Sequence, residues 1–548
     1  MALPDKLYFP LSVTKKNQVG TIGKNITDGL SYLNKPYPRT IELKEWIQYL
    51  INNSLIDLTT NLLPWQNTLF VDPAGFTSVD ILSPIKGDSH QMWASIYDSV
   101  QDATNATPMV DGDHIEIGKG DYTYTLVAGA TTAESTLNKY TNSSFRLAPG
   151  STVAITQAAT ITGLFSDADT QFDSSQDRHT KVDSFGSDWS IVSTSAPIPI
   201  MITMYNVDST FIGKFGKLTG VNTGRQWLVQ SACKYFDVEI DEVTGITGDL
   251  VASLGWRSKN SGGDVNKSDA YERLAINSVT WNQTYTTSGT AFRVQPGGVS
   301  DNTDSRIIFD IGSLIINGSG GGEAHIEAGL DNAGTTIRYN LGTIHNNSSG
   351  TGAYPGDYTV TGSGEYKGFT FGAGVINYES VVVDVDSWIS NREFLSFFGS
   401  AGLDGTRFLF KVNKGRTVDH TCLRLGSALA LTNGAQLIVE GDFATDAEAC
   451  IQLYGISLDA TSSILFRGRY ETTGAGKSVV LIKSITGTGA NNIIFENCTL
   501  INDGVAAAIG SDTAGQNIII KNCFTNSTVV DGDVTELGGT MLKDANII

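Results

Sequence analysis

SVVVDVD, running from Ser380 to Asp386, is the first of six copies of one phrase. The others are RFLFKVN from Arg407, QLIVEGD from Gln436, SILFRGR from Ser463, NIIFENC from Asn492 and NIIIKNC from Asn517. Successive copies begin 27, 29, 27, 29 and 25 residues apart. A period of this size is typical of solenoids, and short apolar runs bounded by Gly, Asn and Asp indicate strands. The repeat predicts a coil in which each copy forms one rung.

Alternation within the phrase predicts which side chains form the core. The fifth position is charged in every copy, with alternating sign: Asp384, Lys411, Glu440, Arg467, Glu496 and Lys521. Because alternate residues of a strand face opposite sides and unpaired charges are costly to bury, this charged column faces outward. The second and fourth positions then face inward: Val381, Phe408, Leu437, Ile464, Ile493 and Ile518, with Val383, Phe410, Val439, Phe466, Phe495 and Ile520. We interpret the charged column as a device that fixes strand register, in preference to a set of catalytic acids.

The third position of the phrase is aliphatic in every copy, although it shares the outward face with the charged column. Its residues, called the aliphatic stripe below, are Val382, Leu409, Ile438, Leu465, Ile494 and Ile519. A continuous outward apolar stripe is unusual on a soluble monomer, and strands that are apolar on both faces are normally covered on both. The stripe predicts a trimer interface; the alternative is a loop of the same chain lying over it.

A turn is expected directly after the charged column, at Val385, Val412, Gly441, Gly468, Asn497 and Asn522. Asn497 and Asn522 occupy this turn position, where side-chain amides can bond from rung to rung, and each precedes a cysteine. The pattern N-I-I-x-x-N-C resembles the repeats of right-handed parallel β-helices of the pectate-lyase-like class, which includes bacteriophage tailspikes and many polysaccharide lyases and hydrolases. The resemblance implies an all-β right-handed parallel β-helix solenoid. The calcium-binding aspartates and arginine base of pectate lyases in this class match no residues here, so we expect no metal and no cofactor.

The chain divides by pattern into three parts. Residues 1–85 are expected to form a small, partly helical head or adaptor domain, since TIELKEWIQYLINNSLID, from Thr40 to Asp57, has an apolar stripe at helical spacing. Residues 86–530 are assigned to the β-helix, and residues 531–548 to a C-terminal tail. Within the β-helix, residues 86–125 are expected to supply a capping helix and the first strand.

The capping helix is predicted from four apolar side chains that share one helical face: Trp93, Ile96, Tyr97 and Val100. The following segment, DGDHIEIGKGDYTYTL from Asp111, resembles the entry to the coil in the same class of β-helices. His114 and Glu116 are interpreted there as outward strand residues. Further along, RIIFDIGSLIIN from Arg306 matches TIRYNLGTIHNN from Thr336, 30 residues later, which predicts two more stacked rungs.

Composition limits the classes of partner. The 548 residues carry a formal net charge of −20, which disfavours nucleic acid because phosphate binding requires a basic surface. No basic segment followed by an apolar segment lies near Met1, and the sequence has no long apolar run. We therefore expect no signal peptide, synthesis in the host cytoplasm and no membrane insertion. The five cysteines show neither metal spacing nor a disulfide framework, and Cys498 and Cys523 are expected to stack as small core residues.

One region, from Trp227 to Tyr285, combines aromatic and acidic residues. Aromatic faces beside acids suit sugar stacking and hydrogen bonding, and the candidate carbohydrate contacts are Trp256, Asp264, Asp269, Tyr271, Glu272, Trp281 and Tyr285. The alternative is that the tryptophans fill the core or a subunit interface. Catalysis on a glycan needs two suitably spaced carboxyl groups, or a base with charge stabilisation, and no motif identifies either, so enzymatic activity is left undecided.

These observations favour a bacteriophage virion protein: a trimeric tailspike or tail fibre that binds, and potentially depolymerises, a host surface polysaccharide. Its partners would be two further copies of itself, other virion proteins at the N-terminal region, and the glycan. Two alternatives stay open. One is a monomeric polysaccharide lyase or hydrolase, and the other is a structural virion fibre without glycan activity.

Overall fold

The computed structural model describes the chain almost entirely as β-strands and their turns, with no helix among the residues described. Described are residues 68–71, 86–87, 90–91, 95–97, 114–117, 121–126 and 142–147, and residues 149–543 except 158–163, 171–172, 175–176, 194–200, 223–226, 247–249, 256–257, 261–262, 284–288, 295–301, 319–320, 327–331, 347–368, 372–373, 391–392, 398–400, 419, 427, 490–491, 514–515, 532–533 and 537–540. The chain separates into two compact units, Met1–Gly120 with Ser144–Arg146, and Asp121–Ser143 with Leu147–Ile548.

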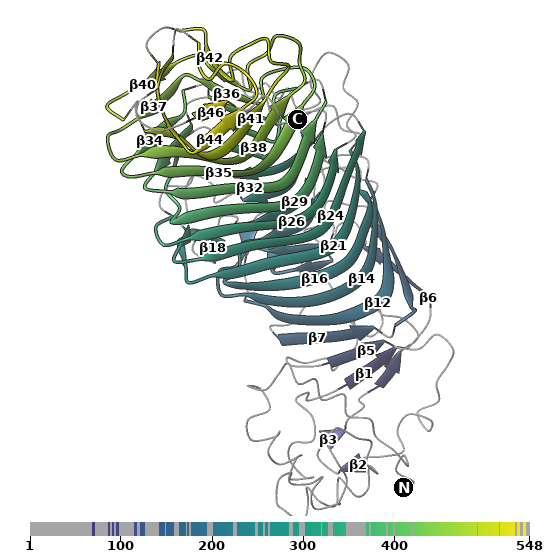
Figure 1. Cartoon of the computed structure of the whole chain (residues 1–548). Helices are drawn as coiled ribbons and strands as arrows, with labels where there is room; N and C mark the ends of the chain where they lie inside the picture. The colour runs from purple at the N-terminus through teal and green to yellow at the C-terminus, as the bar shows by residue number, and fades with distance from the viewer. Residues whose placement is uncertain are drawn as a thin grey trace, which may run out of the picture. The chain divides into compact units, whose positions relative to one another are not determined.

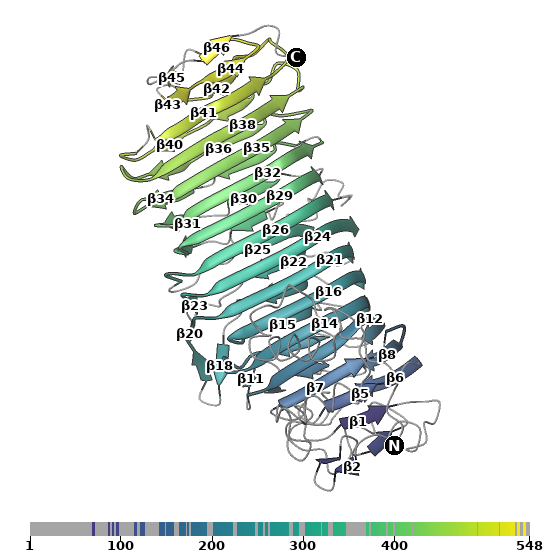
Figure 2. The same cartoon turned by 60° about the horizontal axis from the view of Figure 1, so that its bottom comes forward.

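The larger unit is a parallel β-helix whose long sheet carries the site (Figures 1 and 2). Each strand of this sheet pairs in parallel with the equivalent strand of the next rung, so the sheet extends along the coil axis. Its strands are β6 (Asp121–Leu126), β8 (Thr152–Gln157), β12 (His179–Ser193), β14 (Thr210–Asn222), β16 (Tyr235–Ile246), β21 (Tyr271–Gln283), β24 (Arg306–Gly318), β26 (Thr336–Asn346), β29 (Ser380–Ser390), β32 (Arg407–Thr417), β35 (Gln436–Thr445), β38 (Ser463–Thr472), β41 (Ile493–Ile501), β43 (Gln516–Lys521) and β44 (Cys523–Thr525).

Two further parallel sheets of short strands contribute to the coil, and the second is present only in the rungs between Gly374 and Thr486. The first contains β9 (Phe165–Ser166), β13 (Ile202–Met204), β15 (Trp227–Ser231), β17 (Leu250–Leu254), β22 (Gly289–Val294), β25 (Gly321–Ile326), β27 (Phe369–Phe371), β30 (Leu395–Phe397), β33 (Leu423–Gly426), β36 (Ile451–Tyr454), β39 (Val480–Ile482) and β42 (Ile509–Ser511). The second contains β28 (Gly374–Ile376), β31 (Ala401–Asp404), β34 (Ala430–Thr432), β37 (Ile456–Leu458) and β40 (Ile485–Thr486).

The rung register predicted from the repeated phrase is confirmed. Val381 pairs with Phe408, which pairs with Leu437, and the pairing continues through the later copies. All twelve side chains predicted to face inward are completely buried. Aromatic rings stack between in-register rungs, as in the 4.8 Å pair of Phe466 with Phe495, so the core is built of columns parallel to the coil axis. The earlier match of Arg306 with Thr336 is also a register pair.

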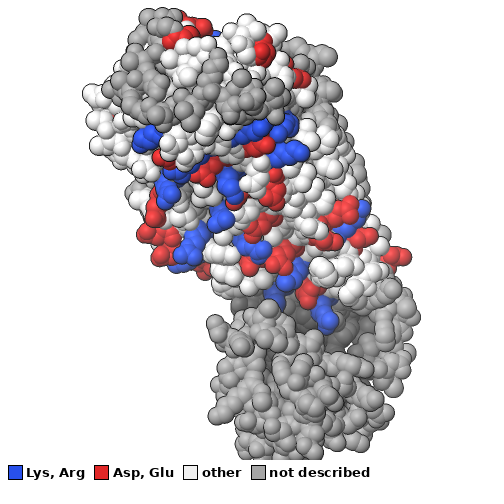
Figure 3. All heavy atoms as spheres, in the orientation of Figure 1, with Lys and Arg blue, Asp and Glu red and all other residues white. Residues whose placement is uncertain are grey.

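The charged column faces outward and forms ion pairs between rungs. Lys411 Nζ lies 3.2 Å from Asp384 Oδ1, and Arg467 contacts Glu440 and Glu496 at 3.1 and 2.6 Å. These side chains are about one-third exposed, so each pair contributes at most about 1 kcal/mol to stability. Figure 3 shows that acidic and basic residues are interspersed over this face.

The aliphatic stripe also follows the predicted parity. Its members are partly exposed, in alternation with the buried columns, except that Ile438 is only 9% exposed. On earlier rungs the same register position is held mainly by charged residues, including Arg273 and Arg338. The stripe therefore begins at Val382 and occupies only the C-terminal half of the sheet.

The predicted turn after the charged column is wrong for the first rungs. Val385 and Val412 are fully buried within continuous strands, and the inward pattern changes parity only after them. In the last rungs, Asn497 and Asn522 do adopt left-handed backbone conformations, with φ of 55° and 52°, but their side chains are exposed. The following Cys498 is buried and its backbone amide donates to Cys523 Sγ at 3.4 Å, so the predicted cysteine stack is confirmed.

The smaller unit has strands where a capping helix was predicted. Ile96 and Tyr97 lie in β4 (Ser95–Tyr97), which pairs in parallel with β1 (Thr68–Val71). Because a β-strand cannot present the helical face, this corrects the prediction for that part; Trp93 and Val100 lie outside the described residues. His114 and Glu116 lie in β5 (His114–Ile117), also paired with β1. The predicted helix at Thr40–Asp57 lies outside the described residues.

The remaining strands extend or decorate the units. At the C-terminal end, β45 (Val534–Glu536) and β46 (Met541–Lys543) pair in parallel with β43 and β44, so the coil continues beyond residue 530. The other short strands are β2 (Lys86–Gly87), β3 (His90–Gln91), β7 (Asn142–Leu147), β10 (Ala168–Thr170), β11 (Asp173–Ser174), β18 (Ser258–Asn260), β19 (Gly263–Val265), β20 (Lys267–Ser268) and β23 (Asn302–Thr303). In the described part of the chain, no helix has the length and apolarity needed to cross a membrane.

Candidate functional site

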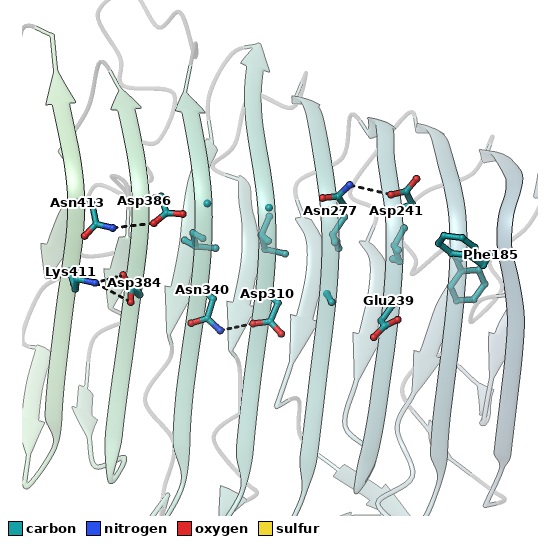
Figure 4. Close-up of a pocket in the computed structure, with 18 residues that line it drawn as sticks. Phe185, Glu239, Asp241, Asn277, Asp310, Asn340, Asp384, Asp386, Lys411 and Asn413 are labelled. Carbon is teal, nitrogen blue, oxygen red and sulfur yellow. Dashed lines mark hydrogen bonds and ion pairs between the residues drawn. The ribbon is translucent and has the colours of Figure 1, made fainter. Parts of the chain in front are cut away.

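A hollow of about 620 Å³ lies on the outer face of the long sheet, and we call it the outer groove. It crosses eight successive strands, from β12 to β32, near the position where the inward parity of the strands changes (Figure 4). At about 4.8 Å per strand, the groove extends for about 30 Å along the coil.

Carboxylates and carboxamides line the outer groove in two outward rows. The carboxylates are Glu239, Asp241, Asp310, Asp384 and Asp386, and the carboxamides are Asn277, Asn340 and Asn413. These residues come from equivalent outward positions of β16, β21, β24, β26, β29 and β32, where strand alternation turns them away from the core. Lys411 is the one cation among the described residues that line the groove.

Each asparagine in the groove donates to a carboxylate of the preceding rung. Asn277 Nδ2 donates to Asp241 at 3.2 Å, and Asn413 Nδ2 donates to Asp386 at 3.1 Å. Asn340 Nδ2 likewise donates to Asp310 Oδ1 (Figure 4). The amide groups are thereby oriented, so the rows have a defined arrangement before any ligand binds.

The floor of the groove is open because three successive strands carry small residues there. Ala275, Gly312 and Gly342 stand where their neighbours have longer side chains. A Cβ at Gly342 would lie 2.2 Å from the Gly312 carbonyl oxygen, and a Cβ at Gly312 would lie 2.5 Å from the Asn277 carbonyl oxygen. Close stacking of the backbones therefore requires these glycines, and their lack of side chains leaves the hollow.

An exposed phenylalanine closes one end of the groove. Phe185 is 63% exposed and lies at the opposite end from Lys411 and Asn413 (Figure 4). It belongs to a bulge in β12, in which the pairing with β14 jumps from Ser184 to Asp188. Bulges commonly redirect a side chain beside a functional site. Here the bulge presents an aromatic ring to solvent at the end of a polar groove.

Cations adjoining the groove form ion pairs with two of its acids. Lys214 Nζ lies 3.0 Å from Glu239 Oε2, and Arg273 contacts Glu239 at 3.1 Å and Asp310 at 2.8 Å. The hydrogen bond from Lys214, followed by that from Arg273, holds the pKa of Glu239 below its ordinary value. At Glu239 the groove consequently presents carboxylate oxygens, which accept hydrogen bonds.

The structure places two of the sequence-predicted sugar contacts in the interior. Glu272 and Trp281 have no exposed surface, so a glycan on the outside of the coil has no access to either. Glu272 instead forms a buried ion pair with Lys267 at 2.8 Å and accepts hydrogen bonds from Ser231 Oγ and the Gly255 amide. Glu272 is therefore engaged by groups of the protein interior and is not a sugar contact.

The other predicted contacts are not brought together in the groove. Tyr271 is partly exposed on the outer face and stacks on Tyr235, with ring centroids 5.5 Å apart. Asp269 is exposed in the turn before β21, with a φ of 53°. Asp264 lies in β19, while Trp256 and Tyr285 lie outside the described residues.

The sequence analysis missed the groove although part of its signal was present. Asp384 belongs to the charged column, which we interpreted as a register device, and Asp386 lies two residues further along the same strand. Extending the same column to earlier rungs leads to Asp310 and then to Glu239, which adjoins Asp241 on the same face. Phe185 gave no such signal, because its exposure depends on a bulge relative to β14.

Neither a metal-binding group nor a similar protein helps to assign a function to the groove. Within the described ranges, no three His, Cys, Asp or Glu side chains are grouped so that they could hold a metal ion. No protein-family model, curated protein or solved structure matches this chain. The functional argument therefore depends on the geometry of the outer groove.

Proposed function

We propose that this chain is a spike or fibre protein of a virion, and that it binds an extended host surface polysaccharide in the outer groove. The observation that carries the proposal is the groove itself, a polar hollow about 30 Å long with preorganised acceptors and an exposed aromatic ring at one end. Such a site suits a chain of sugar rings, whose hydroxyl groups donate hydrogen bonds and whose apolar faces stack on aromatic rings.

The groove supports binding better than hydrolysis. A glycosidase needs one carboxyl group that stays protonated, with a raised pKa, to act as the general acid. The pKa of Glu239 is lowered instead, Asp384 is paired with Lys411, and Asp310 with Arg273. These acids are placed to accept hydrogen bonds from a ligand.

Substitution of Phe185 by alanine is expected to weaken glycan binding by roughly 3- to 10-fold, the loss of one aromatic contact. Stability should not change, because the ring is mostly exposed. The measurement is binding of the full chain to an array of bacterial capsular and lipopolysaccharide glycans, with reducing-end and unsaturated-product assays on any glycan retained.

Phe524→Ala is the matched control, since that ring is 39% exposed on β44 and does not line the groove. Equal weakening by both variants would remove Phe185 from the site. A chain that binds no glycan of the array would contradict the proposed function, and cleavage products would show that the protein is an enzyme.

The proposal includes assembly as a trimer through the aliphatic stripe. What supports it is that six aliphatic side chains face outward on consecutive rungs, five of them partly exposed in a single chain, whereas mainly charged residues occupy the same position on earlier rungs. Attachment to other virion proteins would use the N-terminal region.

The double variant Leu409→Lys/Leu465→Lys is expected to convert a trimer into monomers, because it would bury four additional charges on each pair of packed stripes. Native mass spectrometry should give about three times the 58.5 kDa chain mass for the natural protein and the chain mass for the variant. Gln452→Lys, on the outward side of β36, should leave the trimer intact. A natural protein of 58.5 kDa would exclude the trimer.

A further inference from the structure

We infer that the glycan bound in the outer groove carries no anionic groups, and is either a neutral polyol or a polymer with protonated amines. This inference rests on the proposed function and adds the chemical class of the ligand. It sets this site apart from one built for acidic polysaccharides, in which cationic side chains would face the ligand.

The lining of the groove is rich in acceptors and almost without cations. Five carboxylates and one ammonium group line it, within a chain of net charge −20. An acidic sugar placed among the carboxylates would meet like charges within a few ångströms, whereas hydroxyl or ammonium donors would meet acceptors. The rows therefore discriminate by charge as well as by shape.

The cations at and around the groove are already engaged by its own acids. Lys411 Nζ lies 3.2 and 3.4 Å from the two carboxylate oxygens of Asp384. Lys214 and Arg273 are bound to Glu239, and Arg273 also reaches Asp237 and Asp310. A uronate, sulfate or phosphate group would have to displace one of these carboxylates to gain a counter-charge.

The amide groups add to the same preference. Asn277 and Asn413 donate through Nδ2 to Asp241 and Asp386. These amide donors, which an anionic ligand would need, are therefore directed at carboxylates of the protein. Both aspartates are exposed and keep further acceptor positions. At the far end, Phe185 offers an apolar surface, which suits the uncharged face of a sugar ring.

The test compares three glycan classes of similar length by isothermal titration calorimetry on the full chain. The probes are neutral oligosaccharides of mannose, glucose and galactose, chitosan oligosaccharides, and the anionic oligogalacturonate and dextran sulfate. We expect the neutral or amine-bearing class to bind at least about tenfold more tightly than either anionic probe. Raising salt separates the two supporting cases, since it weakens binding of the amine-bearing class and leaves neutral binding unchanged.

Charge reversal at the exposed pair of aspartates provides the matched variants. Asp241→Lys/Asp386→Lys is expected to reverse the order, with a gain of at least about tenfold for the anionic probes. The control Asp208→Lys/Asp512→Lys makes the same change in net charge at exposed acids outside the groove and should preserve the natural order.

The outcomes separate the inference from the proposed function. Preference of the natural protein for an anionic probe, or equal gains in both double variants, would overturn the inference while glycan binding stood. Absence of binding to every probe would overturn both. Binding of a neutral or amine-bearing probe that only the groove variant reverses is the expected result.

Discussion

Substitution of Lys267 by methionine is expected to lower the free energy of unfolding by about 3–5 kcal/mol, which is typical when one partner of a buried ion pair is removed. Lys267 and Glu272 are 1% and 0% exposed, and their charged atoms lie 2.8 Å apart. Glu272 lies on the inward face of β21, in register with Phe236 and Ile307. Without the ammonium group, its charge would be left among apolar neighbours with only two neutral hydrogen-bond donors.

The double variant Lys267→Met/Glu272→Gln should recover most of this loss, because it leaves no charge to bury. The amide oxygen can accept from the Gly255 backbone amide, and the amide NH2 can donate to Ser231 Oγ, since a hydroxyl both donates and accepts. Lys477→Met is the matched control, since Lys477 and Glu448 form a pair that is 43% and 45% exposed and is worth less than about 1 kcal/mol. Denaturant unfolding gives the free energies, and hydrogen exchange in β16, β21 and β24 locates the effect. Equal losses in Lys267→Met and Lys477→Met would show that burial does not matter at this pair.

Substitution of Asp167 by asparagine is expected to change how stability depends on pH between about 4 and 6. Burial raises the pKa of Asp167 from 3.8 to about 6, although the amides of Tyr205 and Asn206 donate to it at 2.7 and 2.8 Å. Because the folded chain holds this proton more tightly than the unfolded chain, the free energy of unfolding falls as pH rises through this window. The fall attributable to Asp167 is about 3 kcal/mol and is absent in the variant.

The comparison should be made on slopes, because asparagine also places an amide donor against a backbone donor and lowers stability at every pH. Urea unfolding at intervals from pH 4 to pH 7 supplies the two profiles. Asp208→Asn, at an exposed position of the same turn region, should retain the natural slope. Parallel profiles for the natural protein and Asp167→Asn would contradict the expected proton binding.

The stacking of the coil was predictable from sequence because each rung repeats the same constraint. A charge at the fifth position excludes one strand face from the core, and this fixes the direction of every neighbouring side chain. The predicted turn at Val385 and Val412 is wrong because the strand continues past these residues with its backbone pairing intact. The side chains that face inward shift by one residue only after them, and the repeated phrase contains no residue that marks this shift. The predicted capping helix is wrong at Ile96 and Tyr97 because two adjacent apolar residues are compatible with either a helix or a strand.

The site was less predictable than the fold. Strand alternation places Glu272 inside, in step with the buried Leu274 and Ile276, whereas the aromatic and acidic composition of the region favoured a sugar contact. The acidic rows are visible in sequence once all rungs are aligned, from Glu239 to Asp386. The hollow between them is not, because it depends on backbone spacing at Gly342 and on a bulge at Phe185.

The alternating charged column has a consequence for how such a coil can change in length. Excision of residues 436–462, one whole repeat, would bring Lys411 opposite Arg467, whereas excision of the two repeats 436–491 would bring it opposite Glu496. Duplications follow the same arithmetic. Evolutionary changes in the length of this part of the molecule are thus favoured when they add or remove an even number of repeats.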